Sequence, residues 1–187
     1  MENDLFRGEL VRLAMEDSLV LAEGFSKWNR DSEFHRLLDT EPSRVMSVKG
    51  TKNWIENDLE KENPDLIFFS IRTLDEDRLI GFIGFDGLQW THGDAFVFIG
   101  LGERGYWGKG YGTDAMRVIL RYAFTELNLH RVSLDVFEYN PRAIRSYEKA
   151  GFRYEGRIRK MISRDGGRAD DLLMGILRDE WIRLQEA

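Results

Sequence analysis

The stretch that decides the fold runs from Gly100 to Ala115 and reads Gly100-Leu-Gly-Glu-Arg-Gly-Tyr-Trp-Gly-Lys-Gly-Tyr-Gly-Thr-Asp-Ala115. The apolar, aromatic-rich segment Ala95–Ile99 before it predicts a buried strand. After it, helical spacing of apolar residues predicts a helix from about Thr113: Ala115, Met116, Ile119, Leu120, Ala123, Phe124 and Leu127. A strand, a glycine-dense turn and a helix start present free backbone N–H groups to an anion. The stretch therefore predicts either a diphosphate-binding loop or a plain tight turn, and glycine density alone does not decide between them.

Two well-known phosphate loops fit this stretch poorly. A P-loop needs Gly-Lys followed directly by Ser or Thr, but Lys109 is followed by Gly110. The dinucleotide fingerprint G-x-G-x-x-G/A matches twice, at Gly100, Gly102 and Gly105 and again at Gly110, Gly112 and Ala115. That fold requires several further strand–helix units, and only the segment 141–150 clearly predicts another helix afterwards. A dinucleotide-binding oxidoreductase is therefore the weaker interpretation.

The segment Trp107–Gly112 resembles the coenzyme A pyrophosphate motif Q/R-x-x-G-x-G/A of the GNAT superfamily of N-acetyltransferases. Gly110 and Gly112 fill both glycine positions, whereas Trp107 stands where Gln or Arg is usual. Backbone N–H groups are expected to bind the phosphates, so this departure concerns packing against the cofactor.

A second motif lies further along the chain, in Asn140–Phe152. Asn140 predicts a helix N-cap, Pro141 a first helical position and Gly151 a C-terminal stop. The stretch resembles the GNAT motif Asn-x-x-Ala-x-x-x-Tyr-x-x-x-Gly-Phe at every fixed position. The two motifs occur in the family's order, separated by one predicted helix and the predicted strand Arg131–Phe137. Together they are specific for the superfamily.

Composition limits the classes that remain. The chain has 187 residues, of which 42% are hydrophobic, enough for one well-filled core, so we predict one domain over residues 1–187. No apolar run is long enough to span a bilayer and no leader is evident, so a cytoplasmic protein without membrane association is expected. The absence of cysteine excludes disulfides, thiolate nucleophiles and Cys-ligated zinc, and we expect no metal. The net charge of −6 argues against a nucleic-acid partner.

The remaining sequence predicts the elements around these motifs. The predicted strands are Leu10–Leu13, Leu66–Arg72, Arg78–Phe85, Ala95–Leu101, Arg131–Phe137, Arg157–Ser163 and Asp171–Leu177. Asp17 caps a predicted helix over Leu19–Phe25, and Lys52–Lys61 predicts another, stopped by Pro64. Because a helix of about four turns connects Ala95–Leu101 to Arg131–Phe137, those two strands should be parallel. Gly81 and Gly84 indicate a bulge or a close neighbour.

The fold expected from this order is an α/β (α+β), GNAT-like single domain. Its central sheet is mixed but mostly antiparallel, with about seven strands flanked by helices. The C-terminal stretch Asp171–Leu177, followed by Glu180 and Trp181, is similar to the RimJ/RimL branch, the ribosomal-protein alanine acetyltransferases and their relatives. In the resembled family, the polar region from Trp28 to Ser47 would cover the acceptor substrate.

The resemblance implies transfer of an acetyl group from the co-substrate acetyl-CoA to a primary amine through a tetrahedral intermediate. It implies a backbone donor for the oxyanion near Gly100–Gly102, and Tyr147 as the acid that protonates the leaving thiolate. The CoA-binding positions it implies are Leu101, Gly102, Trp107, Gly108, Lys109, Gly110, Tyr111, Gly112, Thr113, Asn140 and Arg145.

The general base and the acceptor are less determined. Glu103 is the candidate base, but Asp135, Glu138 and His130 compete with it, and spacing does not choose among them. At pH 7, deprotonating an α-amine of pKa near 8 costs roughly 1.4 kcal/mol of free energy, whereas deprotonating a lysine costs nearly 5. The lack of an evident base therefore mildly favours a low-pKa amine. A ribosomal-protein N-terminus, a polyamine, an aminoglycoside and a free amino acid all stay open, and a homodimer, common in the family, is one expected assembly. The first alternative is a CoA-binding protein that has lost transferase activity and acts as a sensor or structural partner, and the dinucleotide oxidoreductase comes after it.

Overall fold

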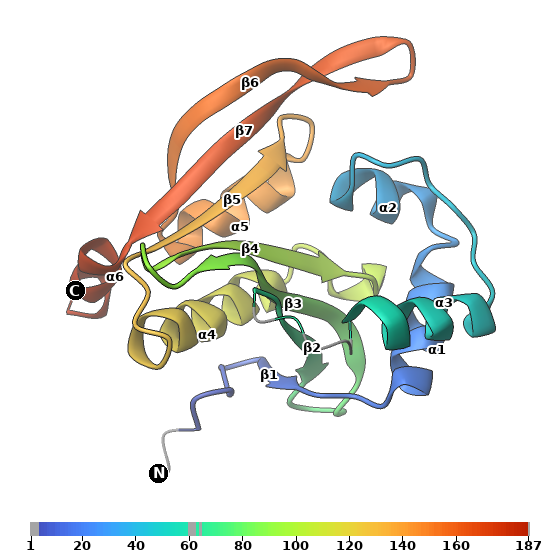
Figure 1. Ribbon diagram of the computed structural model, residues 1–187, viewed down its shortest axis with the longest axis horizontal. Coiled ribbons are helices and arrows are strands. Elements are labelled where there is room, and N and C mark those ends of the chain that lie inside the picture. Colours follow the sequence, from blue (N-terminus) through green and yellow to red (C-terminus); the bar gives the residue numbers. More distant parts are fainter. Residues whose placement is uncertain (1–3, 60–62, 64, 187) are drawn as a thin grey trace.

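The computed structural model describes residues 4–59, 63 and 65–186, which fold around one seven-stranded sheet (Figure 1). Its strands follow the spatial order β1-β2-β3-β4-β5-β7-β6. They are β1 (Val11–Ala14), β2 (Ile67–Thr73), β3 (Leu79–Gln89), β4 (Asp94–Leu101), β5 (Arg131–Phe137), β6 (Arg153–Arg164) and β7 (Gly167–Leu177). All neighbouring pairs are antiparallel except β4 and β5, which are parallel as predicted. The expected mixed, mostly antiparallel sheet is confirmed.

Helices cover both faces of this sheet. The larger core lies under α4 (Tyr111–Thr125) and α5 (Pro141–Ala150), with α6 (Arg178–Gln185) at its edge through Trp181. A smaller, aromatic core holds α1 (Ser18–Trp28), α2 (Ser32–Leu38) and α3 (Val48–Trp54) against Phe82 on the other face. Short helical segments continue α3 over Ile55–Leu59 and follow β4 over Arg104–Tyr106. None of the helices in the described ranges is long and apolar enough to cross a membrane.

Several predicted boundaries needed correction. The helix predicted over Lys52–Lys61 begins earlier, at Val48, because Ser47 accepts a hydrogen bond from the Gly50 amide at 3.1 Å. Its predicted end at Lys61 and the stop at Pro64 lie outside the described residues.

The C-terminal hairpin also differs from its prediction. β6 and β7 extend over 153–164 and 167–177, well beyond the predicted segments, and project past the rest of the sheet (Figure 1). The helix α6 was not predicted, and α2 occupies part of the region from Trp28 to Ser47 that looked irregular. In α2, Asp31 supplies the N-cap by accepting the amides of Glu33 and Phe34.

Two of the three glycines of β3, Gly81 and Gly84, mark close backbone approach. A Cβ on Gly81 would lie 2.2 Å from the Gly100 carbonyl oxygen, and one on Gly84 would lie 2.1 Å from that of Ile67. The sequence prediction of a close neighbour at these positions is therefore confirmed.

One carboxylate ties the N-terminal segment to α4. The Asp114 side chain is buried and accepts the amides of Glu9, Leu10 and Val11 at 3.1, 2.8 and 3.0 Å. A carboxylate in the first turn of a helix is also favoured by the helix dipole. Asp114 thereby fixes the start of α4 against the strand that opens the sheet.

The parallel pair β4 and β5 separates along its length. Pairing runs only from Asp94 with Arg131 to Phe96 with Ser133. Beyond those residues the facing edges of both strands have no partner strand in the described chain. Their carboxyl-terminal halves therefore leave an opening, and the loop after β4 and the N-terminus of α5 lie beside it.

Candidate active site

The loop between β4 and α4 presents unpaired amides. Gly108 and Gly110 have φ values of 72° and 96°, which favour glycine, and Gly110 is the N-cap of α4. Asp114 is the first residue of this helix whose amide has a backbone acceptor, the Gly110 carbonyl at 2.9 Å. Amides 108–113 donate no hydrogen bond within the described chain. They form an anion-binding helix N-terminus, and a diphosphate fits this chemistry.

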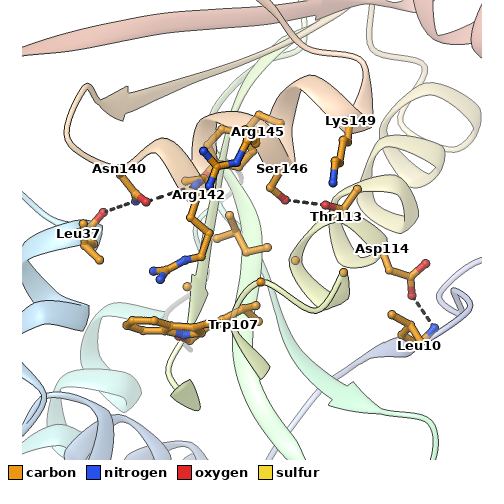
Figure 2. Close-up of a pocket in the computed structure, with 18 of the residues that line it drawn as sticks. Leu10, Leu37, Trp107, Thr113, Asp114, Asn140, Arg142, Arg145, Ser146 and Lys149 are labelled. Carbon is orange, nitrogen blue, oxygen red and sulfur yellow. Dashed lines mark hydrogen bonds between the residues drawn. The ribbon is translucent and has the colours of Figure 1, made fainter. Parts of the chain in front are cut away.

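These amides open into a cavity of about 440 Å³ between β4, α2, α4 and α5 (Figure 2). Nine of the predicted site residues line it: Leu101, Trp107, Gly108, Gly110, Gly112, Thr113, Asn140, Arg145 and Tyr147. Gly102, Lys109, Tyr111 and Glu103 do not line it. On α5, Asn140 caps the helix by accepting the Ala143 amide at 3.3 Å. The Ser146 and Thr113 hydroxyls are joined at 2.8 Å, linking α5 to α4 inside the cavity.

Four cationic side chains line the same cavity: Arg117, Arg142, Arg145 and Lys149. No carboxylate of the described residues forms a salt bridge with any of them. Burial lowers the pKa of the Arg142 guanidinium from its usual value. The carboxylates of Glu9 and Asp114 also line the cavity, but the four cations have no salt-bridge partner among the described residues. Cations without such partners beside free amides suit a polyanionic ligand such as the phosphates of CoA. Of the four, only Arg145 was predicted.

Trp107, which departs from the family motif, joins three parts of the site. Its indole Nε1–H donates to the Leu101 carbonyl at 2.6 Å. The guanidinium of Arg142 lies 3.9 Å from the centre of the indole ring, and that of Arg104 lies at 5.0 Å. Figure 2 shows Arg142 pointing from α5 toward this ring. The indole therefore fixes the end of β4 and holds a cation over the loop.

The end of β4 offers free amides to the opening. The Gly102 amide donates to the Ile80 carbonyl at 2.9 Å, so it is already used. Because backbone groups alternate in direction along a strand, the Leu101 and Ile99 amides point away from β3 and toward the opening. Within the predicted segment Gly100–Gly102, Leu101 is thus the residue whose amide is available to an oxyanion.

Tyr147 comes from the face of α5 that packs on the larger core, and it is half-buried. Its hydroxyl forms no hydrogen bond with the described residues, and its ring packs against Phe152 with centroids 6.1 Å apart. Desolvation raises the pKa of the Tyr147 phenol, and the Asp135 carboxylate adds to this effect. The phenol therefore stays protonated near neutral pH, as an acid must.

Glu103 has a different environment from the one expected of a base. Its carboxylate pairs with Lys27 and Arg78 and accepts the Trp28 indole N–H at 3.1 Å. Burial raises the pKa of Glu103, but the hydrogen bonds from Lys27 and Trp28 outweigh it and leave that pKa below its ordinary value. These contacts tie α1 to the loop after β4, which favours a structural role.

The competing bases are also placed by the fold. His130 lies at the start of β5, where its amide donates to the Gly93 carbonyl, at the end opposite to the opening. Glu138 accepts the Asp170 amide at 2.7 Å. Asp135 lies in the half of β5 from which β4 has separated, and its pKa is raised by desolvation. None of the three lines the cavity. Of the two at the open end of β5, Asp135 is the one whose carboxylate does not accept the amide of another strand.

Comparison with known proteins agrees with this geometry. Residues 9–153 match the family described as the acetyltransferase (GNAT) domain. The probable N-acetyltransferase YjcK of Bacillus subtilis (strain 168) is 33% identical over 159 residues, 84% of this chain and 87% of that protein. The uncharacterized N-acetyltransferase p20 of Bacillus licheniformis is 29% identical over 172 residues, 92% of this chain and 93% of that protein.

The fold is shared with solved structures. The spermidine N-acetyltransferase of Vibrio cholerae in complex with CoA and spermine superposes with a TM-score of 0.76 at 24% identity, covering 92% of this chain and 98% of that one. A GNAT-family acetyltransferase from Bacillus anthracis gives 0.77 at 23% identity, covering 93% and 98%. The chain belongs to the GNAT acetyltransferase family. It is an N-acetyltransferase that uses acetyl-CoA as co-substrate and acetylates an amine.

Proposed function

We propose that this enzyme acetylates a primary amine by direct attack on the thioester, with CoA held by amides 108–113. The observation that carries this proposal is the convergence of three groups on one cavity. Free loop amides, the free Leu101 amide and the Tyr147 side chain come from separate elements and meet beside the opening between β4 and β5. A cavity used only to bind CoA would not need the last two.

The residues take these roles in order. Gly108, Gly110, Gly112 and Thr113 surround the diphosphate, and the four cations compensate its charge. The Leu101 amide donates to the oxyanion that forms at the thioester carbonyl, and one such donor typically lowers the barrier by about 3 kcal/mol. Tyr147 protonates the thiolate as the carbon–sulfur bond breaks.

The acceptor belongs to the class of small or terminal amines. The RimJ/RimL-like C-terminal sequence supports a protein N-terminus, whereas the fold neighbour from Vibrio cholerae is named for spermidine and supports a polyamine. We propose the RimJ/RimL-type branch, with small-molecule amines retained as candidates. A homodimer is proposed as the assembly, and apolar side chains exposed on β6, such as Tyr154, Ile158 and Met161, support an interface there.

An amine panel tests the function directly. Release of the CoA thiol is measured with acetyl-CoA and alanine-terminated peptide, spermidine, an aminoglycoside, free amino acids and methoxyamine. Turnover of at least one amine, with its acetyl product found by mass spectrometry, is the expected result. Tight binding of acetyl-CoA with no turnover of any amine would instead identify a CoA-binding sensor. Stabilisation by NAD and not by acetyl-CoA would support the oxidoreductase.

A further inference from the structure

Two carboxylates lie side by side on β5, which borders the opening, and on β7, which pairs with the other edge of β5. Asp135 pairs in register with Leu173, and Asp171 pairs with Phe137. Their neighbours Val136, Leu172 and Met174 point into the core under α4 and α5. Side chains alternate along a strand, so Asp135 and Asp171 share the opposite face. No basic side chain of the described residues forms a salt bridge with either one.

The two carboxylates differ in exposure. Asp135 remains accessible to solvent although the surrounding chain partly desolvates its carboxylate, whereas Asp171 is only 3% exposed. The Oδ1 atom of Asp171 is buried without any hydrogen-bond partner. In register, Asp171 lies between Phe137 of β5 and Ile158 of β6, which offer it no donor. The Leu172 amide stabilises the carboxylate in part, but no cation of the described residues does, so its pKa is still raised. Burying a carboxylate with so little compensation is costly, and its presence in an ordinary sheet position calls for a function.

Neither carboxylate lines the cavity, and Asp135 is the member of the pair that connects it to Tyr147. The negative charge of Asp135 acts on the Tyr147 phenol, and it also acts on Asp171. Tyr147 reaches the opening from the core face of the sheet, whereas the carboxylates lie on the other face. An amine arriving on the carboxylate face would therefore meet the thioester from the side opposite to the acid.

We propose that Asp135 receives the ammonium group of the acceptor and takes its proton, with Asp171 behind it as a positioning residue that shares the negative charge. This inference rests on the proposed acetyl transfer. Burial raises the pKa of Asp171 to about 6, with Asp135 as the second cause, so the pair holds a proton readily.

The proton balance is complete. The ammonium loses one proton to Asp135, which passes it to solvent, and the free electron pair forms the carbon–nitrogen bond. As the carbon–sulfur bond breaks, Tyr147 gives its proton to the thiolate. The nitrogen then releases its second proton, which restores the phenol. Two protons leave the nitrogen, one goes to solvent and one ends on the CoA sulfur.

The test compares Asp135→Asn and Asp171→Asn with a matched control, Asp170→Asn. Asp170 is the adjacent carboxylate of β7, but it forms a salt bridge with Arg157 at 3.0 Å and accepts a hydrogen bond from the Lys160 amide at 2.9 Å. The kcat/KM of each variant is measured with every panel amine the wild type acetylates, from spermidine to the weakly basic methoxyamine. Acetyl-CoA affinity is measured by calorimetry.

We expect kcat/KM for strongly basic amines to fall about 10²-fold in Asp135→Asn and about 10-fold in Asp171→Asn. The deficit should shrink for weakly basic amines, which are already neutral, and acetyl-CoA affinity should not change. The inference would be overturned if kcat/KM fell by the same factor for all amines. It would also be overturned if Asp135→Asn and Asp171→Asn had the same kcat/KM as Asp170→Asn. If the wild type acetylates no amine, the proposed function itself has failed.

Discussion

The phenol of Tyr147 enters the cavity from α5 and forms no hydrogen bond with the described residues. Replacing it by phenylalanine keeps the ring contact with Phe152 and removes only the acid. We expect Tyr147→Phe to lower kcat about 10²-fold, the low end of acid–base effects, with little change in acetyl-CoA affinity. Steady-state assays of thiol release measure kcat, and calorimetry measures the affinity for acetyl-CoA. Turnover equal to the wild type would remove the phenol from the mechanism.

Asp171 also affects stability, and the sign follows from its raised pKa. An unfolded aspartate titrates near 3.8, whereas burial raises the folded pKa to about 6. Between these values the native state binds more protons, so this group makes the protein less stable as pH rises toward 7. We expect Asp171→Asn to increase the free energy of unfolding at pH 7.5 by about 1–3 kcal/mol. The gain should disappear near pH 4.

Urea denaturation of the variant and the wild type across this pH range measures the difference directly. Other carboxylates, such as Glu16 and Asp31, have lowered pKa values and give the opposite trend in both proteins. The difference between the two curves isolates Asp171. Destabilisation of Asp171→Asn at pH 7.5 would show that its carboxylate makes a favourable contact.

At the scale of elements, the loop before α4 depends on backbone conformation. A side chain at Gly110 would be strained at a φ of 96°, and its Cβ would lie 3.3 Å from Leu10 Cδ1. Shifting this N-cap moves the amides that face the cavity. We expect Gly110→Ala to weaken CoA binding by about 10-fold, since such strain costs roughly 1–3 kcal/mol. Gly105→Ala is the control, because its Cβ would contact nothing within 4 Å.

The attachment of α4 to the N-terminal segment gives a second prediction at this scale. Asparagine at position 114 offers one acceptor oxygen in place of two to the amides of Glu9, Leu10 and Val11. We expect Asp114→Asn to lower the free energy of unfolding by about 2–3 kcal/mol, because hydrogen bonds to a charged group are the stronger ones. Denaturant unfolding measures the loss, and a change below the error of that measurement would contradict the assignment.

The elements differ in how well the sequence predicts them, for local reasons. β5 matches its predicted bounds, and so does α5, whose ends are marked by the helix signals Asn140, Pro141 and Gly151. The hairpin of β6 and β7 was underestimated because β6 is mostly exposed and lacks the alternation that marks a half-buried strand.

The site was predictable where one motif carries it and not where distant elements meet. The loop and Tyr147 follow from spacing along the chain. Arg142 and Lys149 could have been found as cations near Arg145 on one short helix. By contrast, the ion pairs of Glu103 with Lys27 and Arg78 depend on residues far away in sequence. The Asp135–Asp171 pair likewise arises only from the register of β5 on β7.

Across the whole molecule, the tip of the β6–β7 hairpin reaches the helix that lines the cavity from the other side. Arg36 of α2 pairs with Asp165 at the tip, and Arg164 donates to the Asp39 carbonyl at 2.6 Å. The Arg36 carbonyl also accepts the Tyr139 hydroxyl at 3.0 Å. These contacts hold α2, with its cavity-lining Phe34, against the far arm of the sheet (Figure 1).

Because Asp165 is largely exposed and Arg36 is partly exposed, their ion pair should contribute little to global stability, about 0.2–1 kcal/mol in a double-mutant cycle. Its effect should instead appear in the position of α2 beside the cavity. We expect Asp165→Ala to raise KM for the amine a few-fold and leave kcat nearly unchanged. A contact that positions α2 stabilises the bound substrate and the transition state equally, so its loss changes KM and not kcat. Salt should reduce the difference from the wild type, because surface charges are screened within about 10 Å at 0.1 M. An unchanged KM at low salt would mean that other contacts hold α2 in place: the Phe34 ring against Trp28 and the hydrogen bond from the Asn140 side-chain amide to the Leu37 carbonyl.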